Sequence, residues 1–456
     1  MKNARTIRQA QRTTLLAAAL LTAASFALPA RAQSPAPAAT ATVYAITHAK
    51  LFTLAGAPID DGTIILRDGK IAAVGPKAEI PAGAQVIDAK GLSVYPGLFD
   101  SVTEMGLSEV SAVSATVDSS ETGDFNPDVV AAEAVHPASE HIPVTRAAGI
   151  TEVLSVPGSG GFDSRGGGGV LTGQASAIHL SGWTIEEMLI NKSVAMGLHW
   201  PVIETRGFDF STFSRKDKPY AEAKKEYEKK LDELSDWLER ARHYAQALEK
   251  GSPARFDRDV KLEALVPVVR GELPVLVFAS RARDIRNAVE FCEKRKLRMI
   301  LAGGEEAFRV KDLLKARNIS VILGPVQEAP AREDDPYDQP MTQPAELSAA
   351  GVKIAFASFD NSFARRLGQQ AAVSVAYGLP YDEALKAVTL YPAQIFGLDR
   401  ELGTLEPGKL ANLIVTNGDP LELTTQLRFL FIKGQLTSLD NKHSLLYDKY
   451  RNRPKP

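Results

Sequence analysis

Apolar runs of strand length alternate with helix-like stretches through the middle of this 456-residue chain. Seven runs have the length and the flanking turn signals of buried strands: GLSVYPGLFD, GITEVLSVPG, QASAIHLSG, LPVLVFAS, LRMILAGG, NISVILGPV and VKIAFASFD. VAMGLHWPVIE at 194–204 is a weaker eighth candidate. The alternation predicts an α/β fold with a parallel sheet wrapped by helices. Eight strands at 95–403 fit a (β/α)8 TIM-like barrel, and an open doubly wound sheet is the alternative.

Both ends of the chain show a different pattern, with short β-rich runs broken by turn signals. Residues 43–94 contain VYAITHAKLFTL, TIILRDGKIAAVG and AQVIDAKGLSV, and residues 404–440 contain ANLIVTNGDP and RFLFIKGQLTSL. Neither group has enough strands to be stable alone, because at least three strands with a buried face are needed. We therefore expect one small composite β-sandwich built from both chain ends, with the barrel between them and residues 441–456 as a tail.

Two insertions interrupt the barrel pattern. Within about 210–255, apolar residues recur at three- and four-residue steps from Tyr227 to Leu248, which predicts one long amphipathic helix with a solvated charged face. The segment Pro157 to Gly173 is rich in glycine and follows a predicted strand. It lacks the lysine of a phosphate-binding loop, so we interpret it as a mobile loop over the barrel mouth.

The first 32 residues predict a secretory signal peptide. A basic start with Lys2 and Arg5 precedes an apolar run from Leu15 to Leu28, and Ala30 to Ala32 fits a cleavage site. We therefore expect a periplasmic or secreted protein, cut after Ala32, with a flexible linker at 33–42. A membrane anchor is the alternative, but the apolar run is shorter than the ~20 residues that span a bilayer.

The composition limits the classes of partner that we expect the protein to bind. The net charge of −2 gives no reason to expect a nucleic acid, so a small-molecule ligand or a protein is the expected partner. Cys292 is the only cysteine, and an intrachain disulfide is therefore impossible.

Two segments carry a family resemblance. TLYPAQIFGLDRELGTLEPGKLANLIVTNGDPLE at 389–422 resembles the end of amidohydrolase-superfamily proteins of the imidazolonepropionase and dipeptidase type. In that family T-x-N-P-A, a G-x-L-E-P-G-K-x-A-(D/N)-L turn and G-D-P-L follow the last barrel strand. Tyr391 stands where asparagine is usual. YPGLFDSVTE at 95–104 resembles P-G-L-(I/F)-D-x-H-x-H, whose two metal-binding histidines are replaced here by Val102 and Glu104.

The resemblance implies zinc or another divalent metal, which would activate a water molecule. Its ligands would fall at Val102 and Glu104, at Phe278 or Ser280, at Gly303, and at an aspartate after VKIAFAS, where Asp360 lies one residue beyond the expected place. Valine, phenylalanine and glycine side chains have no lone pair to donate, so we expect no metal cofactor. None of the seven histidines forms H-x-H or H-E-x-x-H. Only His179 falls on a strand that faces a plausible site, and a core histidine is the alternative there.

Polar residues gather at the predicted strand ends. Asp360 and Glu104 are candidate catalytic carboxylates, because two carboxyl groups with separated pKa values can share acid and base roles. Four further residues are candidates for substrate binding: Gln174, Ser280, Arg281 and Glu305. Asp100 and Glu306 belong to the same group. Ordinary rim residues and helix caps are the alternative for each of them.

Three hypotheses about function follow. The first is a secreted amidohydrolase-like protein that has lost its metal centre and binds a small molecule or a partner. The second is an active hydrolase of carbon–nitrogen bonds other than peptide bonds, with a cyclic amide or dipeptide-like substrate and a non-standard site. The third is a structural subunit, either a homo-oligomer or a chain paired with an active homologue.

Overall fold

The computed structural model describes residues 42–159, 169–209, 214–250, 258–451 and 453–454. The predicted signal peptide, nearly all of the linker and most of the glycine-rich loop lie outside the described residues. In the described part, no helix combines the length and the apolar character that crossing a membrane requires.

The central sheet has eight strands in the order β15-β14-β13-β12-β9-β8-β7-β6. They are β6 (Leu98–Thr103), β7 (Ile150–Ser155), β8 (Leu171–His179), β9 (Leu189–His199), β12 (Val275–Ala279), β13 (Met299–Gly303), β14 (Val321–Leu323) and β15 (Ile354–Phe356). Each predicted barrel strand is present, and the weak candidate at 194–204 begins inside β9. Short apolar runs such as VLVFA are buried along most of their length because both faces of the sheet are covered.

One strand departs from the predicted parallel arrangement. β8 pairs antiparallel with both β7 and β9, so the expectation of a fully parallel sheet is wrong at this strand. Only residues 180–188 connect β8 to β9, and they include the four-residue helix α4 (Ile185–Met188). A parallel connection needs a crossover of about a dozen residues or more, so this short link forces β9 to run back beside β8.

The sheet closes on itself where β15 meets β6. The Phe359 backbone N–H donates to the Val102 carbonyl at 2.9 Å, and the Thr103 hydroxyl donates to the Asp360 carbonyl at 2.8 Å. These bonds join segments more than 250 positions apart in the sequence. The central sheet is therefore a nearly closed barrel, with the fold class that the sequence predicted.

The two chain ends form a second eight-stranded sheet in the order β18-β17-β16-β5-β1-β2-β3, with β4 paired to β1. Its strands are β1 (Tyr44–Leu51), β2 (Ile59–Arg67), β3 (Lys70–Gly75), β4 (Gln85–Asp88), β5 (Ser93–Pro96), β16 (Leu413–Thr416), β17 (Leu427–Ile432) and β18 (Gln435–Leu436). β16 pairs antiparallel with β5, which confirms that both ends build one composite sheet. The rings of Tyr44 and Phe431 meet edge to face at 5.2 Å across its core.

Gly97 marks the passage from the composite sheet to the barrel. The predicted run GLSVYPGLFD is divided here, since β5 belongs to one sheet and β6 to the other. A Cβ atom on Gly97 would lie 1.8 Å from the Thr151 hydroxyl oxygen, so only glycine allows the chain to pass this close to β7.

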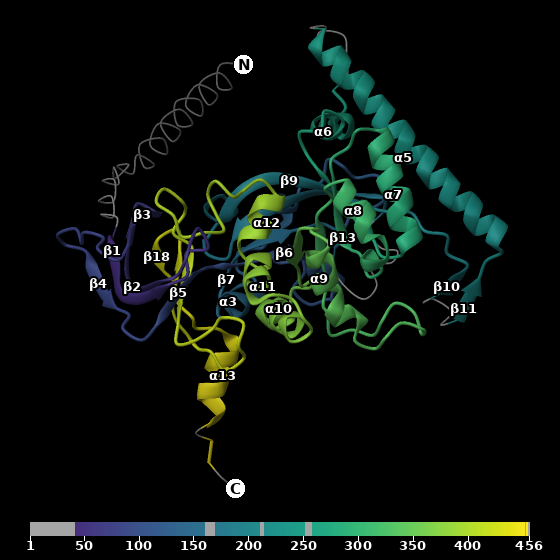
Figure 1. Ribbon diagram of the computed structural model, residues 1–456. Helices are drawn as coiled ribbons and strands as arrows, with labels where there is room; N and C mark the ends of the chain where they lie inside the picture. The colour runs from purple at the N-terminus through teal and green to yellow at the C-terminus, as the bar shows by residue number, and fades with distance from the viewer. Residues whose placement is uncertain (1–41, 160–168, 210–213, 251–257, 452, 455–456) are drawn as a thin grey trace, which may run out of the picture. The chain divides into compact units, whose positions relative to one another are not determined.

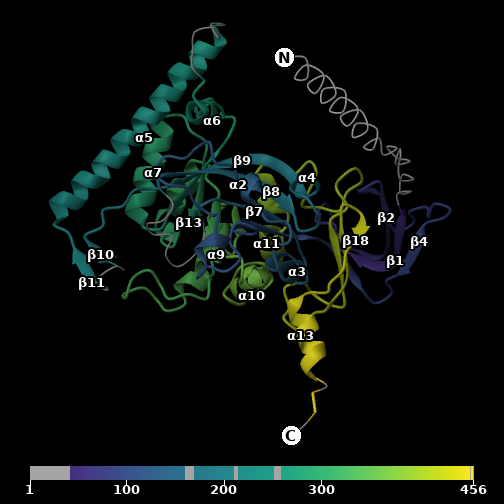
Figure 2. The same ribbon diagram turned by 180° about the vertical axis from the view of Figure 1, so that it is seen from behind.

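Helices cover the outside of the barrel (Figures 1 and 2). The longer ones are α5 (Tyr220–Glu249), α6 (Val260–Val269), α7 (Ala282–Lys294), α9 (Gln339–Ala349) and α10 (Leu367–Ala376). The C-terminal helix α13 (Lys442–Arg451) projects away from the barrel and buries none of its residues. Shorter ones are α2 (Ala131–Ala134), α3 (His141–Arg146), α8 (Lys311–Ala316), α11 (Tyr381–Ala387) and α12 (Leu390–Ile395). A hairpin of β10 (Arg206–Asp209) and β11 (Ser214–Asp217) precedes α5.

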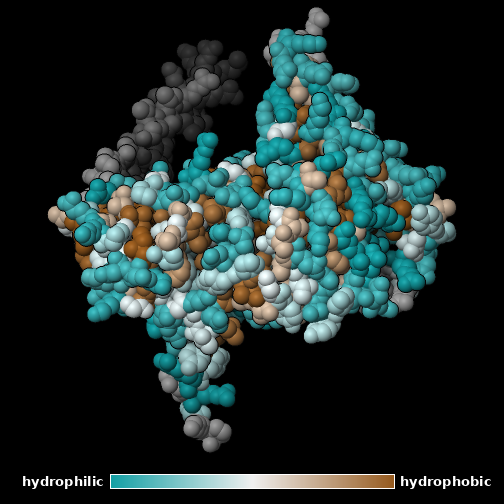
Figure 3. Space-filling view, in the orientation of Figure 1, coloured by the Kyte–Doolittle hydropathy of each residue, from teal (hydrophilic) through white to brown (hydrophobic). Residues whose placement is uncertain are grey.

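The long helix α5 confirms the predicted amphipathic insertion. It buries Leu234, Leu238, Ala241 and Ala245, which lie on the predicted apolar stripe. Hydrophilic side chains predominate over α5 in Figure 3, as expected of a solvated charged face.

Candidate functional site

The barrel interior is filled by apolar side chains from every part of the sheet. They form one buried cluster that includes Phe99, Val102, Leu154, Ala175, Ala195, Leu276, Ile300, Ile322 and Ala355. A barrel of eight strands has an interior just wide enough for such side chains. Chemistry in this fold is therefore restricted to the carboxyl ends of the parallel strands, which we call the barrel mouth.

An aromatic group occupies the barrel mouth. The His199 ring at the end of β9 stacks on Phe278 of β12 with centroids 4.3 Å apart and planes inclined by 10°. Phe278 in turn meets Phe359 edge to face at 6.1 Å. Phe359 has a positive φ of 51°, which is uncommon for a bulky residue, and its ring lies against the end of β14 at Gly324. We call His199, Phe278 and Phe359 the mouth aromatic cluster.

His199 is held as a neutral imidazole. Burial lowers its pKa to about 4, although a hydrogen bond to the backbone of Gly158 acts in the opposite direction. Its Nε2 atom is buried and has no hydrogen-bond partner among the described residues. No motif in the sequence marks His199. Its place at the end of the weakest predicted strand was the one signal for it.

Asp100 lies beneath this group and joins the first barrel strand to the last. Its carboxyl group is buried and accepts hydrogen bonds from the Ser358 backbone N–H at 2.9 Å and from the Ser358 hydroxyl at 2.5 Å. Burial raises the pKa of Asp100 to about 7, because the charged form loses its hydration. The carboxyl group thus stabilises the closure of the barrel.

The two predicted catalytic carboxylates lie at the ends of the same two strands. Asp360 follows β15, and its Oδ1 atom accepts from the backbone N–H groups of Ser362 and Phe363 at 2.5 and 2.8 Å. This is the geometry of a side chain that caps a turn. Glu104 directly follows β6 and is half-buried, and its carbonyl accepts from the Leu107 N–H at 2.9 Å.

The predicted substrate-binding residues do not share one surface. Gln174 lies inside β8, next in sequence to the inward-facing Ala175, and donates to the Pro127 carbonyl at 3.1 Å. It therefore faces away from the barrel interior, and its expected place at a strand end is wrong because β8 begins three residues earlier, at Leu171. Ser280 follows β12, and its carbonyl accepts from the Glu306 N–H at 2.9 Å. Arg281 is exposed at the start of α7.

Glu306, and not its neighbour Glu305, is the buried carboxylate after β13. Glu305 is exposed, whereas Glu306 accepts from the Arg332 Nε atom at 2.5 Å, from Arg332 Nη2 at 2.9 Å and from the Ala282 N–H at 2.9 Å. The bond to Arg332 holds the pKa of Glu306 below its usual range. The Ala282 contact ties the start of α7 to the loop after β13, and the Arg332 contacts tie the loop after β14 to it, so the carboxylate stabilises both loops.

The side chains at the mouth do not fit the metal centre that the resemblance implies. Val102 is fully buried and packs in the inner cluster, Phe278 is part of the mouth aromatic cluster, and Gly303 has no side chain. None of the three supplies a lone pair. Across the described residues, no group of three or more His, Cys, Asp or Glu side chains converges in a way that would hold an ion.

His179 lies at the opposite end of the barrel from the mouth. It pairs with Glu152 across β8 and β7, and the Asn412 side-chain amide lies 2.7 Å from the Glu152 Oε1 atom and 3.1 Å from the His179 Nδ1 atom. Burial raises the pKa of Glu152 to about 8 and lowers that of His179 to about 3. Since Asn412 comes from the composite sheet, this cluster links that sheet to the barrel. His179 is the core residue that the sequence analysis left open as an alternative.

Comparison with known sequences gives matches of two kinds, a family model and individual proteins. Residues 284–440 match the model of the amidohydrolase family. Amidohydrolase tasK from Hapsidospora irregularis is 24% identical over an alignment of 403 residues that covers 80% of this chain but only 38% of that relative. Adenine deaminase 3 from Rhizobium meliloti (strain 1021) is 39% identical over 64 residues, or 14% of this chain and 10% of that protein. The chain thus spans much less than the full length of these relatives.

Solved structures share the fold. An amidohydrolase from Thermotoga maritima MSB8 superposes with a TM-score of 0.73 at 24% identity, covering 87% of this chain and 99% of that one. A prolidase solved with N-methylphosphonate-L-proline superposes with a TM-score of 0.52 at 17% identity, with the same coverage of 87% and 99%. At these identities the superpositions establish the architecture, and they leave the chemistry to the residues of this chain.

Proposed function

Because the chain belongs to the amidohydrolase superfamily, we propose that it is a degenerate member, which binds a small molecule or a partner at the barrel mouth without a metal centre. The observation that supports this proposal is the mouth aromatic cluster. A hydrolytic metal site needs converging lone pairs at several strand ends, and three of these positions carry valine, phenylalanine and glycine. Rings that stack on one another occupy this region instead.

The proposed mouth site favours a ligand with a planar group. Phe278 and Phe359 are half-buried, so part of each ring remains accessible at the mouth. A flat group that packs against such rings gains about 0.5–1.5 kcal/mol beyond the burial of its area.

Metal analysis tests the proposal. After dialysis, the purified protein is expected to hold much less than one equivalent of zinc, manganese or iron per chain. Added zinc should also leave the unfolding temperature unchanged, whereas a ligand at about a hundred times its Kd stabilises a protein by about 2.7 kcal/mol. One equivalent of metal that survives a weak chelator would overturn the proposal. It would favour the alternative of an active hydrolase of cyclic amides or dipeptide-like substrates.

A pair of matched variants locates the binding site. Ligands found by a thermal-shift screen should lose most of their effect in Phe278→Leu, because the ring that stacks on His199 is gone. Phe363→Leu provides the control, since Phe363 is 50% exposed outside the cluster. Equal responses in both variants would place the site elsewhere on the protein.

Export remains part of the proposal. The basic start, the apolar run and the small residues before Gln33 support a signal peptide that is removed after Ala32. Amino-terminal sequencing of the protein recovered from a periplasmic extract should begin at Gln33. A chain that begins at Met1 and stays in the cytoplasmic fraction would contradict export.

A further inference from the structure

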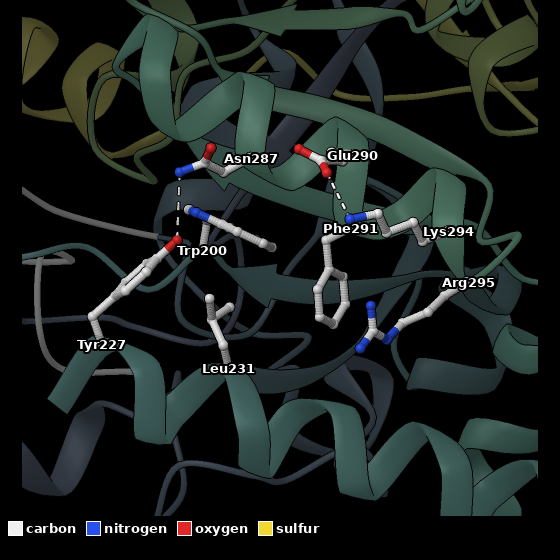
Figure 4. A pocket seen from close by; sticks show the side chains of 8 residues that line it. All are labelled: Trp200, Tyr227, Leu231, Asn287, Glu290, Phe291, Lys294 and Arg295. Carbon is white, nitrogen blue, oxygen red and sulfur yellow. Dashed lines mark hydrogen bonds and ion pairs between the residues drawn. The ribbon is translucent and has the colours of Figure 1, made fainter. Parts of the chain in front are cut away.

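A cavity of about 280 Å³ lies outside the barrel, between α5 and α7. The residues important here are Trp200 after β9, Tyr227 and Leu231 on α5, and Asn287, Phe291 and Arg295 on or just after α7 (Figure 4). Trp200, Tyr227 and Asn287 lie at one end, Arg295 lies at the other, and Leu231 and Phe291 lie between them. The cavity is thus polar at both ends and apolar in the middle.

One end of the cavity presents an indole N–H donor without a well-formed hydrogen bond. Trp200 is only 4% exposed, and its buried Nε1 atom has no acceptor at hydrogen-bond geometry among the described residues. The Tyr227 hydroxyl, whose pKa burial raises, lies close enough to Trp200 for a weak interaction that opposes this rise. Its ring is fixed edge to face against Phe291 at 5.4 Å. Buried tryptophan N–H groups usually find an acceptor, because leaving one unpaired costs about 1–3 kcal/mol. An acceptor on a bound molecule would remove this cost.

The other end presents an unpaired positive charge. Lys294 is neutralised by Glu290 at 2.6 Å, and Arg242 by Glu239 at 2.5 Å. Arg295 packs its guanidinium group over the Phe291 ring at 3.8 Å and donates to the Ser235 hydroxyl at 2.7 Å. In the part of the chain that the structure describes, no ion pair includes Arg295, and its Nε atom has no acceptor. The local balance is therefore one positive charge, which suits a monoanion.

We propose that this cavity binds a small elongated monocarboxylate, with its carboxylate at Arg295, a planar apolar body between Leu231 and Phe291, and a neutral acceptor such as a hydroxyl group at Trp200. The volume supports a small ligand, since pockets for drug-sized molecules hold about 300–1,000 Å³. Because the cavity lies outside the barrel mouth, the proposal is independent of the metal-free mouth and goes beyond the function proposed above.

Three related compounds test both ends of the cavity by calorimetric titration of the full-length protein. They are 3-(4-hydroxyphenyl)propionate, 3-phenylpropionate, which lacks the acceptor, and 3-(4-hydroxyphenyl)propanamide, which lacks the charge. The first compound should bind best. Loss of the hydroxyl group should weaken binding by about two- to tenfold, and loss of the charge by about ten- to a hundredfold.

Matched variants test which residue binds each end of the ligand. Trp200→Phe should weaken binding of the hydroxylated acid and leave 3-phenylpropionate unchanged. Arg295→Gln should weaken both acids by about tenfold or more and leave the amide unchanged. Arg286→Gln is the control, because Arg286 is exposed on the same helix and is not among the residues that line the cavity.

A variant that binds more tightly distinguishes a direct effect on binding from damage to the fold. Glu290→Gln releases Lys294 from its ion pair and should tighten binding of both acids by up to about fivefold, which a destabilised cavity would not do. The proposal would be overturned if 3-(4-hydroxyphenyl)propionate, at concentrations up to about 10 mM, showed no saturable binding to the folded wild-type protein. Equal affinity in Arg295→Gln and the wild type would overturn it as well.

Discussion

The buried carboxyl group of Glu152 makes a specific prediction about how stability depends on pH. Glu152 is 3% exposed at the junction of the barrel and the composite sheet, and burial raises its pKa from 4.5 to about 8. The folded protein therefore keeps a proton that the unfolded chain releases above about pH 4.5. Stability falls with rising pH wherever the folded state binds more protons, so this contribution is lost as the pH rises through about 8.

The size of the loss follows from the shifted pKa values. Between about pH 7 and about pH 9, Glu152 accounts for a loss of about 1.4 kcal/mol, and Asp100, with its pKa of about 7, for about 0.4 kcal/mol. The pKa values of His179 and His199 are lowered, so their effect appears mainly as the pH falls below about 6.5. In this window the two histidines offset only about 0.3 kcal/mol. Burial raises the pKa of the Cys292 thiol from 9.0 to about 12, and this adds a loss of about 0.4 kcal/mol, because the thiol of the unfolded chain ionises near pH 9. The net expected loss is about 1.9 kcal/mol.

Urea unfolding at about pH 7, 8 and 9, followed by circular dichroism, measures this loss. Glu152→Gln keeps the shape of the side chain but does not ionise, so its free energy of unfolding should fall by only about 0.5 kcal/mol over this range, because Asp100 and Cys292 still titrate. Glu133→Gln removes an exposed carboxylate and should show the wild-type loss. If the wild type is equally stable at all three pH values, or if Glu152→Gln loses as much as the wild type, then Glu152 does not keep its proton in the folded protein.

Three further substitutions and one control substitution probe the framework of the fold by the same unfolding assay. Phe431→Ala should lower the free energy of unfolding by about 3–5 kcal/mol, because it leaves a cavity in the core of the composite sheet. Leu436→Ala is the control: this side chain is 46% exposed, and its loss should lower the free energy of unfolding by less than about 0.5 kcal/mol. Gly97→Ala should destabilise strongly, since its Cβ atom would overlap Thr151; a melting temperature within error of the wild type would contradict this. Ser358→Ala removes a hydroxyl donor to the buried Asp100 carboxyl group, and it should lower the free energy of unfolding by about 1–3 kcal/mol. An unchanged free energy of unfolding would show that this carboxyl group is solvated.

Most of the architecture could be predicted from the sequence because burial leaves a direct pattern. Strands covered on both faces appear in the sequence as short apolar runs, and the helix α5 appears as apolar residues repeated at three- and four-residue steps. Strand direction leaves no such pattern. The reversal of β8 depends on the length of the link at 180–188. Gln174 lies inside β8, which begins at Leu171, and the alternation of side chains along the strand places it on the outer face.

The candidate site was harder to predict because it depends on contacts between distant residues. Asp360 and Ser280 lie next to the expected strand ends, but the backbone geometry of turns and loops decides what they bond. His199 becomes a candidate site residue only because Phe278, which lies 79 positions later in the sequence, stacks on its ring. No spacing rule within a single strand identifies such a pair.

The mouth aromatic cluster also gives a physical reason why the barrel remains stable if the metal centre is absent. Histidine and carboxylate ligands that converge on one point repel one another or remain unsatisfied when no cation joins them, and each buried polar group without a partner costs about 1–3 kcal/mol. Val102 and Phe278 avoid this cost, because they pack at positions where the resemblance would place such ligands. Each aromatic pair adds about 0.5–1.5 kcal/mol. A change back toward a ligand, such as Phe278→His, should therefore destabilise the protein in the absence of metal. Unfolding in the presence and absence of zinc measures this directly, and a variant as stable as the wild type without zinc would show that the cluster contributes nothing.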